Sequence, residues 1–200
     1  DNTYSVNQEG CYYSKYEARD LLKTFVKKFK GSDLDKKGVK VSMFESGSME
    51  GDDSSCAAYM DCILGRGPKY VFKNAKLRKY FKEVSMHSYW SGADTKKNAE
   101  KYISDKYSKY SVAATEYCQM TDDKNTGVYD LIAKEKKGTN GTSIKYGVAM
   151  ANTIVDDLTI MNANEWDWWT ACSYGTYTDG LIYLDEDNHE NLDFSKRYYC

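Results

Sequence analysis

The hydrophobic and polar positions of the chain follow two patterns, the period of an amphipathic helix in some segments and short apolar runs in others. The first helix is predicted to begin at Ser14, which forms an S-x-x-E capping box with Glu17, and to end at Gly31. Its helically spaced apolar residues are Ala18, Leu21, Leu22, Phe25, Val26 and Phe29. The segment is therefore predicted as an amphipathic helix.

Four further segments are predicted as helices. The longest covers Ser143 to Asn162 and carries its apolar residues on one stripe, as an amphipathic helix does. The residues of this stripe are Ile144, Val148, Ala151, Ile154, Val155 and Leu158. Shorter helices are predicted from Ser54 to Leu64, from about Ala75 to Lys82, and from Lys96 to Tyr107, the last with Thr95 as its N-cap.

Short runs of apolar and β-branched residues between these helices predict four strands, Val39 to Glu45, Val84 to Trp90, Ser111 to Met120 and Asn164 to Thr170. Leu181 to Leu184 is predicted as an outer hairpin strand. Because strands alternate with helices, we expect an α/β fold with parallel pairing. A doubly wound sheet is the alternative, but it normally carries a glycine-rich phosphate turn, and the sequence has no GxGxxG or P-loop. A barrel, with its chemistry at the carboxyl ends of its strands, is favoured.

The composition adds an excess of aromatic residues and argues against two classes of partner. The 200 residues include 19 Tyr and 4 Trp, and sugars pack their C–H faces on such rings, although ordinary core packing is the commoner use. The net charge of -2 argues against a nucleic-acid surface, and no run approaches the roughly 18 apolar residues of a membrane span. We therefore expect neither nucleic acid nor a membrane as partner.

The cysteines leave the cellular setting open. The chain has 6 Cys with no CxxC pair and only 2 His, which argues against a zinc site. Their spread suits disulfides in an exported protein or free buried thiols in a cytosolic one. Asp185-Glu186-Asp187 resembles the start of a calcium loop, but Glu190 and Lys196 stand where that loop requires Gly and Glu. We expect no metal ion and no other cofactor.

Two glutamates stand at predicted strand ends. Glu116 follows the apolar and small residues 112–115, and a carboxylate there is costly to desolvate unless it is hydrogen-bonded or functional. An ion pair with a lysine on the rim is the equally simple alternative. Glu45 has the same placement on its own strand. His87 and Tyr89 share a strand face and could orient a carboxylate, although a core histidine is the simpler interpretation of His87 alone.

Six segments, taken together and in order, are more specific than any single residue. They are QEGCYYS at 8–14, VSMHSYWS at 84–91, ATEYCQ at 114–119, EWDWWTA at 165–171, DGLIY at 179–183 and SKRYY at 195–199. The chain resembles glycoside hydrolase family 30, and is most similar to the branch acting on β-1,6-linked galactan. The resemblance implies that residues 1–200 form the C-terminal half of a (β/α)8 TIM barrel, strands five to eight, incomplete at both ends.

The same resemblance implies roles for individual residues. Glu116 falls on the position of the nucleophile, and Trp166 matches the eighth-strand aromatic residue that floors the sugar site. The other substrate-binding positions that it implies are Glu45, His87, Tyr89, Trp90 and Trp168. The expected activity is that of a retaining endo-glycoside hydrolase, with β-1,6-galactan as the polysaccharide substrate.

Retaining hydrolysis also needs a second carboxyl group about 5–5.5 Å from the nucleophile. The resemblance places this acid/base in an Asn-Glu-Pro stretch upstream of Asp1. Asn7-Gln8-Glu9 is superficially similar, but Glu9 aligns better with the downstream segment. We therefore expect the remaining half of the barrel as a partner, no turnover by this chain alone, and a secreted or cell-surface location. The alternatives are a non-catalytic or degenerate carbohydrate-binding barrel fragment, and a structural fragment without a ligand.

Overall fold

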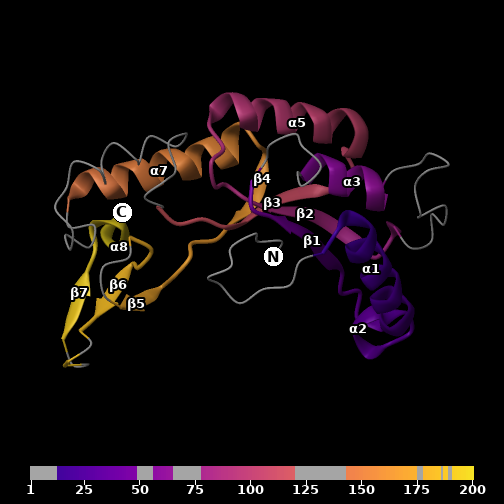
Figure 1. Ribbon diagram of the computed structural model, residues 1–200, viewed down its shortest axis with the longest axis horizontal. Coiled ribbons are helices and arrows are strands. Elements are labelled where there is room, and N and C mark those ends of the chain that lie inside the picture. The colour runs from indigo at the N-terminus through magenta and orange to yellow at the C-terminus, as the bar shows by residue number, and fades with distance from the viewer. Residues whose placement is uncertain are drawn as a thin grey trace.

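The computed structural model describes residues 13–48, 56–64, 78–119, 143–174, 178–185, 187–188 and 191–200 (Figure 1). Its elements in chain order are α1 Lys15–Phe29, α2 Asp33–Lys36, β1 Val41–Ser46, α3 Cys56–Leu64, β2 Phe81–His87, α5 Ala93–Tyr107, β3 Ser111–Glu116, α7 Ile144–Thr159, β4 Ala163–Trp166, β5 Cys172–Tyr174, β6 Ile182–Leu184, β7 Leu192–Phe194 and α8 Lys196–Tyr199. Among these described elements, strands and helices alternate from β1 to β4, as the sequence predicts.

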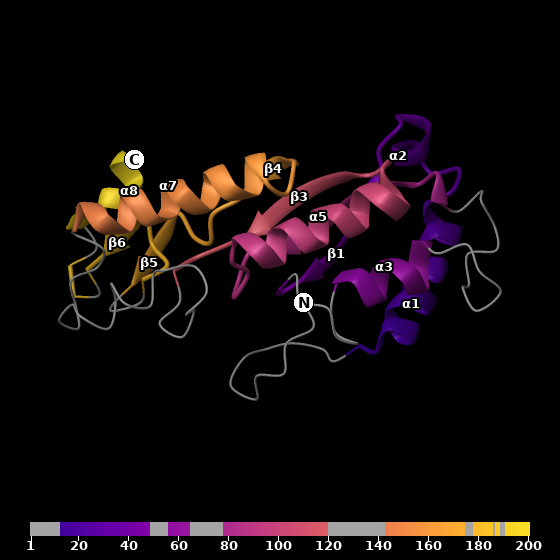
Figure 2. The same cartoon turned by 90° about the horizontal axis from the view of Figure 1, so that it is seen from above.

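The main sheet has the strand order β1-β2-β3-β4, and every neighbouring pair is parallel. The helices α1, α3, α5 and α7 pack against one another in that order, with α3 against β1 and α7 against β4. Seen from above, α5 lies over β1 and β3 (Figure 2). This is the layered arrangement of part of a (β/α)8 barrel, so the predicted α/β fold class is confirmed.

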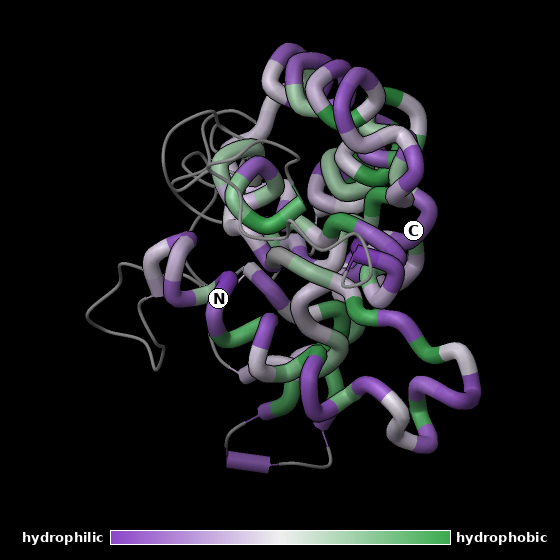
Figure 3. The backbone as a smooth tube through the Cα atoms, turned by 90° about the vertical axis from the view of Figure 1, so that its right-hand side faces the viewer, coloured by the Kyte–Doolittle hydropathy of each residue, from purple (hydrophilic) through white to green (hydrophobic). Residues whose placement is uncertain are grey.

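The two faces of the sheet differ in chemistry because side chains alternate along each strand. One set packs into the main apolar core under the helices, and it comprises Val41, Met43, Val84, Met86, Val112, Ala114 and Ala163. Hydrophobic and hydrophilic residues alternate along the turns of the helices that cover this core (Figure 3). The opposite set includes His87 and Thr115, and the register shift at the end of β1 brings Glu45 to the same face, where it hydrogen-bonds to both. The polar set therefore lies on the face that would line a barrel's interior.

Helix α1 forms as its sequence predicts. The side chain of Ser14 accepts a hydrogen bond from the backbone of Glu17, and the Glu17 carboxylate accepts one from the Ser14 backbone. Gly31, at φ +81°, follows the helix in the left-handed conformation that glycine adopts without a steric penalty. The predicted capping box and helix end are both confirmed.

Several predicted boundaries are wrong. Helix α5 is capped by Gly92 rather than by Thr95, which lies within its first turn. The helix predicted from about 75 to 82 falls partly outside the described residues, and Phe81 and Lys82 already belong to β2. Phe81 is buried and pairs with Val41, so tertiary pairing overrides local helix propensity there.

The predicted strand ends extend too far along the chain. β2 ends at His87, β3 at Glu116 and β4 at Trp166. After β2 the backbone turns, and Trp90 has a φ of 54°, in the left-handed region and far from the extended conformation of a regular strand. The aromatic residues predicted to continue β2 and β4 are instead held in the loops that leave the sheet.

The apolar stripe of α7 does not face the sheet. Ile144, Val148, Val155 and Leu158 are between 43% and 56% exposed. The buried side of the helix carries a different set, Tyr146, Gly147, Met150, Thr153 and Asp157. Amphipathicity therefore predicts the helix correctly and its buried side wrongly, and the side that is buried includes Asp157, which accepts hydrogen bonds from Ser88 and Trp166.

A second, smaller sheet follows in the order β5-β6-β7 and is drawn in orange to yellow in Figure 1. β6 pairs antiparallel with β7, which confirms the predicted outer hairpin strand, and parallel with β5. α8 packs against α7, where Gly147 leaves room for the Cys200 side chain. Arg197 of α8 is buried and hydrogen-bonds to Gly180, Tyr183 and Gln119.

The thiols of Cys62, Cys118, Cys172 and Cys200 are free, so the disulfide prediction is not supported for these four. Cys11 and the Cys56 side chain lie outside what the structure describes. Across the described ranges, no helix is both long and apolar enough to cross a bilayer. Within the same ranges, no group of three or more His, Cys, Asp or Glu residues is placed to hold a metal ion.

Candidate active site

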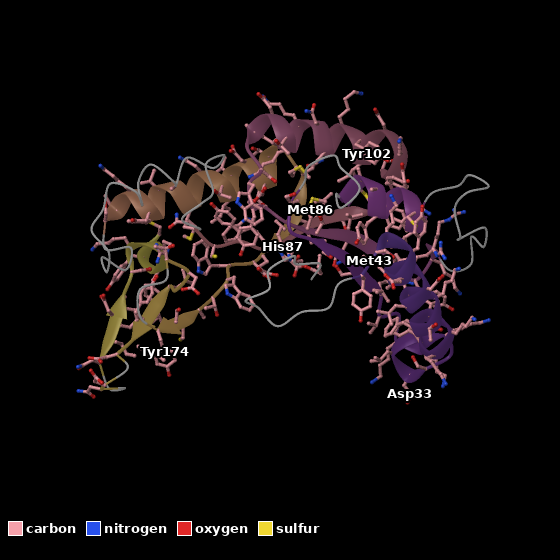
Figure 4. All side chains as sticks on the ribbon, viewed as in Figure 1. Asp33, Met43, Met86, His87, Tyr102 and Tyr174 are labelled. Atoms are coloured by element: carbon pink, nitrogen blue, oxygen red, sulfur yellow. The ribbon has the colours of Figure 1, made fainter. Side chains whose placement is uncertain are left out.

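The carboxyl ends of β1, β2 and β3 bring three predicted site residues together. His87 pairs with Glu116 in the parallel register of β2 and β3, and Glu45 lies at the neighbouring end of β1. Figure 4 shows His87 near the middle of the molecule, where these strands converge. The carboxyl ends of parallel strands meet at one edge of a sheet. Glu45 therefore lies at the same edge as His87, 42 positions away in sequence, and Glu116, 71 positions away.

His87 is buried and lies between the two carboxylates. Its Nε2 atom is 3.0 Å from Oε2 of Glu45, and its Nδ1 atom is 3.7 Å from Oε1 of Glu116. The first distance is a hydrogen bond and the second is a longer electrostatic contact. The imidazole therefore connects the two glutamates and fixes Glu45 more tightly than Glu116.

The Glu45 carboxylate is hydrogen-bonded to side chains of β2 and β3. Oε2 accepts from the Thr115 hydroxyl at 2.6 Å and lies within hydrogen-bonding distance of His87. Burial acts to raise the pKa of Glu45, but the hydrogen bonds with His87 and Thr115 outweigh it and lower the pKa to about 2. Glu45 is therefore ionised at neutral pH.

The backbone at Glu45 is strained. Its φ is 58°, and the β1–β2 register shifts between Phe44 and Ser46. A left-handed non-glycine residue of this kind costs roughly 1–3 kcal/mol and persists only where its surroundings hold it. The hydrogen bonds from Thr115 and His87 are the contacts that hold this carboxylate in place.

Glu116 has fewer partners. Its Oε1 atom accepts from the Tyr89 hydroxyl at 3.1 Å, and its side chain is 27% exposed. Burial, together with the neighbouring Cys118 and Glu116, raises the pKa of Tyr89 far above its ordinary value, so the phenol remains a neutral donor. Burial raises the pKa of Cys118 to about 11, so this thiol, 3.5 Å from the same phenol oxygen, stays protonated.

Aromatic rings form one wall beside Glu116. Tyr89, Tyr117 and Cys118 make a buried cluster, and the predicted residues Trp90, Trp166 and Trp168 pack against it. Ring centroids lie 5.6 Å apart for Tyr89 and Trp90, 6.0 Å for Tyr117 and Trp168, and 6.2 Å for Trp166 and Trp168. The structure thus brings the predicted site residues into one region at the carboxyl ends of the strands.

The indole nitrogens of two tryptophans are already bonded to the protein. Trp166 donates to Oδ2 of Asp157 at 2.9 Å, and Trp168 donates to the Asp179 carbonyl at 2.6 Å. Sequence reasoning gave Trp169 no site role, yet Trp169 is 54% exposed and its backbone binds the Tyr117 carbonyl. Of these three indoles, Trp169 presents the most free surface on which a sugar could stack.

Sequence reasoning also missed Thr115 and Asp157 as parts of this region. Thr115 holds Glu45, and Asp157 holds Trp166. The run before Glu116 placed Thr115 at a strand end, but no local signal pairs it with a residue 70 positions away. Asp157 stood outside the apolar stripe of its helix and for that reason drew no attention.

A parallel α/β sheet with paired carboxylates and aromatic rings at the carboxyl ends of its strands is typical of barrel glycosidases. The family model described as O-glycosyl hydrolase family 30 matches residues 2–183, and the chain belongs to this family. The expected family is therefore confirmed. No curated protein sequence matches the chain.

Solved structures agree on the fold. A conserved exported protein from Bacteroides fragilis has a TM-score of 0.67 at 21% identity, over 98% of this chain and 42% of that one. The catalytic domain of the GH30 xylanase C from Talaromyces cellulolyticus has a TM-score of 0.56 at 13% identity, over 97% and 36%. An endo-β1,6-glucanase has a TM-score of 0.50 at 13% identity, over 94% and 37%. The chain therefore spans less than half the length of these proteins.

Proposed function

We propose that this chain supplies the nucleophile, Glu116, of a retaining endo-glycoside hydrolase that cleaves β-linked polysaccharide. The observation that carries the proposal is the state of the Glu116 carboxylate. It lies at the carboxyl end of β3, is held by one phenol donor and is partly exposed beside aromatic rings. A carboxylate that is oriented but not saturated with donors keeps a lone pair for attack on an anomeric carbon.

In the proposed reaction, an oxygen of Glu116 forms a bond to the anomeric carbon while the glycosidic bond breaks. A carboxylic acid protonates the leaving oxygen, and the same group, now a base, takes a proton from the water that releases the sugar. Glu45 is a poor candidate for this acid, because a pKa of about 2 leaves it without a proton at neutral pH. We place the acid/base upstream of this chain, consistent with the greater length of the solved relatives.

The remaining predicted residues take supporting roles in this proposal. Tyr89 orients Glu116, and His87 joins Glu116 to the fixed carboxylate of Glu45. Trp166 and Trp168 build the aromatic wall, and Trp169 is added as the indole with a free face for stacking. Sugar hydroxyls would then find acceptors at the carboxylates while the sugar's C–H face meets the rings.

The proposed substrate is β-1,6-linked galactan, on the strength of the QEGC and EWDWW segments. Two of the similar structures are a xylanase and an endo-β1,6-glucanase, so xylan and β-1,6-glucan are the natural comparison substrates. A secreted or cell-surface location is part of the proposal, and one similar structure is of an exported protein.

The test uses the protein expressed from its complete gene and a panel of β-1,6-galactan, β-1,6-glucan and glucuronoxylan. NMR of the first product should show the β-anomer, since double displacement retains configuration. Initial release of the α-anomer would contradict the mechanism, and a preference for glucan or xylan would contradict the substrate. Binding to galactan with no turnover would favour the non-catalytic carbohydrate-binding alternative.

A further inference from the structure

A buried ion pair joins two helices behind the candidate active site. Asp157 of α7 is fully buried, and its Oδ1 atom lies 2.9 Å from Nζ of Lys96, whose side chain is 2% exposed. Lys96 stands in the first turn of α5. Neither residue belongs to the predicted site, and neither contacts Glu45 or Glu116 through a hydrogen bond described for the site.

The second oxygen of Asp157 is turned toward the site. Oδ2 accepts from the Ser88 hydroxyl at 2.6 Å and from the Trp166 indole nitrogen at 2.9 Å. Ser88 lies between His87 and Tyr89 in sequence, where β2 ends. One carboxylate therefore holds the turn that carries Tyr89 and the tryptophan whose ring packs against Trp168.

Stability alone is a weak explanation for this arrangement. Removing two charges from water costs several kcal/mol per ion, and well-packed apolar pairs of similar volume often stabilise a protein equally or better. What an apolar pair cannot provide is an acceptor for Ser88 and Trp166. Without an acceptor, the indole N–H would be left without a partner, or the ring would turn to find another one.

We propose that Asp157 is a positioning residue that sets the orientation of Trp166 and of the turn carrying Tyr89, and that Lys96 is its ion-pair partner at the buried site. The proposal rests on the function proposed above, in which Trp166 and Tyr89 are parts of the sugar site. It adds that the α5–α7 contact controls the geometry of the sugar site from outside it.

Two double variants separate positioning from stability in the protein expressed from its complete gene. Lys96→Met with Asp157→Leu removes the charges and the acceptor. Lys96→Met with Asp157→Asn removes the same charges but retains an acceptor oxygen for Ser88 and Trp166. The Leu pair leaves the Ser88 hydroxyl and the Trp166 indole nitrogen without this acceptor, and the Asn pair leaves a buried amide N–H2 beside a methionine, so the melting temperatures of both pairs are measured and activity is compared well below the lower one.

Function should distinguish the two pairs at a temperature where both are folded. We expect the Leu pair to lose roughly 10–100-fold in kcat/KM on the substrate that the wild type turns over, the range seen when a partner that orients an active-site ligand is lost. The Asn pair should recover most of that loss. Equal kcat/KM in the two pairs, both measured well below their melting temperatures, would overturn the proposal.

A spectroscopic measurement tests the positioning without turnover. In tryptophan labelled with 15N, the Trp166 indole resonance, assigned through Trp166→Phe, should exchange slowly with solvent in the wild type and in the Asn pair. It should shift and exchange faster in the Leu pair. If the Leu pair does not fold, a fast-exchanging Trp166 indole in the wild type overturns the proposal. If the wild type does not turn over any substrate although its Trp166 indole exchanges slowly, the proposed function is contradicted and the positioning role of Asp157 is not.

Discussion

The ends of β1 and β3 each place a glutamate beside His87, and the two glutamates differ in their hydrogen-bond donors. Glu45 receives a hydroxyl donor from Thr115 and lies 3.0 Å from the histidine, and its pKa falls to about 2. Glu116 receives the Tyr89 phenol, and the histidine stands 3.7 Å away. Donors that stabilise a carboxylate also reduce its basicity and its readiness to attack carbon.

The exposed fraction of the side chains alone would have favoured Glu45 over Glu116 as the nucleophile. The Glu45 side chain is 41% exposed and the Glu116 side chain is 27% exposed. The number and strength of the donors decide the comparison, since each donor lowers the basicity of the carboxylate that accepts it. The difference assigns Glu45 to a fixed, orienting role and Glu116 to bond formation, and each prediction below can break that division.

The largest effect is expected for Glu116→Gln. Loss of a nucleophile lowers kcat by roughly 10⁶-fold in a well-studied hydrolase, and a loss on that scale is expected here. Substrate affinity should change little, because the amide has nearly the shape of the carboxylate. Steady-state kinetics on the preferred polysaccharide, with Glu45→Gln as the matched variant, checks this. A greater loss of kcat for Glu45→Gln than for Glu116→Gln would reverse the assignment.

Glu45→Gln should have the next largest effect. The amide keeps the shape but weakens the contact that orients His87, and loss of such a partner costs roughly 10–100-fold in activity. The loss should be reproduced in smaller measure by Thr115→Val, which removes one donor to Glu45 and leaves the carboxylate in place. Activity in Thr115→Val below that of Glu45→Gln would show that Thr115 acts by another route.

Tyr89→Phe should lower kcat by about 10-fold. The substitution removes the hydrogen bond from the phenol to the Glu116 carboxylate, and a hydrogen bond to a charged group contributes about 1.5–3 kcal/mol at most. The aromatic ring of residue 89 and its packing are retained. The effect should fall on kcat rather than on KM, since the phenol contacts Glu116 and not a remote part of the substrate. An unchanged kcat would mean that Glu116 needs no orienting donor.

The smallest effect concerns acid stability. The ordinary pKa of Glu45 is 4.5 and its folded value is about 2, so its hydrogen bonds stabilise the fold fully above pH 4.5 and are lost as the pH falls toward 2. Because the side chain is 41% exposed and solvent screens its partners, the contribution is about 1 kcal/mol. The free energy of unfolding, measured with urea at pH 6 and at pH 3, should fall less between these two pH values in Glu45→Gln than in the wild type.

Local sequence signals predicted the features that depend on neighbouring residues. The capping box of Ser14 and Glu17 forms, and strand–helix alternation gives the parallel sheet with strand ends at Glu45, His87 and Glu116 nearby. These features follow from short-range periodicity and from the general rule that parallel strands share one functional edge.

The features that depend on distant residues could not be predicted in this way. The Thr115–Glu45 hydrogen bond joins residues 70 positions apart, and Ser88 meets Asp157 across 69. The buried side of α7 was wrong for the same reason. The stripe of Ile144, Val148, Val155 and Leu158 dominates the hydropathy pattern, whereas the buried side of the folded helix includes Asp157, whose partners Ser88 and Lys96 are distant in sequence.

Covalent trapping tests the central assignment most directly. A 2-deoxy-2-fluoro glycosyl fluoride of the preferred sugar slows the release of a glycosyl-enzyme, so the ester can be located by mass spectrometry of peptides. The account predicts one sugar per protein, on the peptide containing Glu116, and none in Glu116→Gln. A sugar on Glu45 or on any other carboxylate would contradict the account.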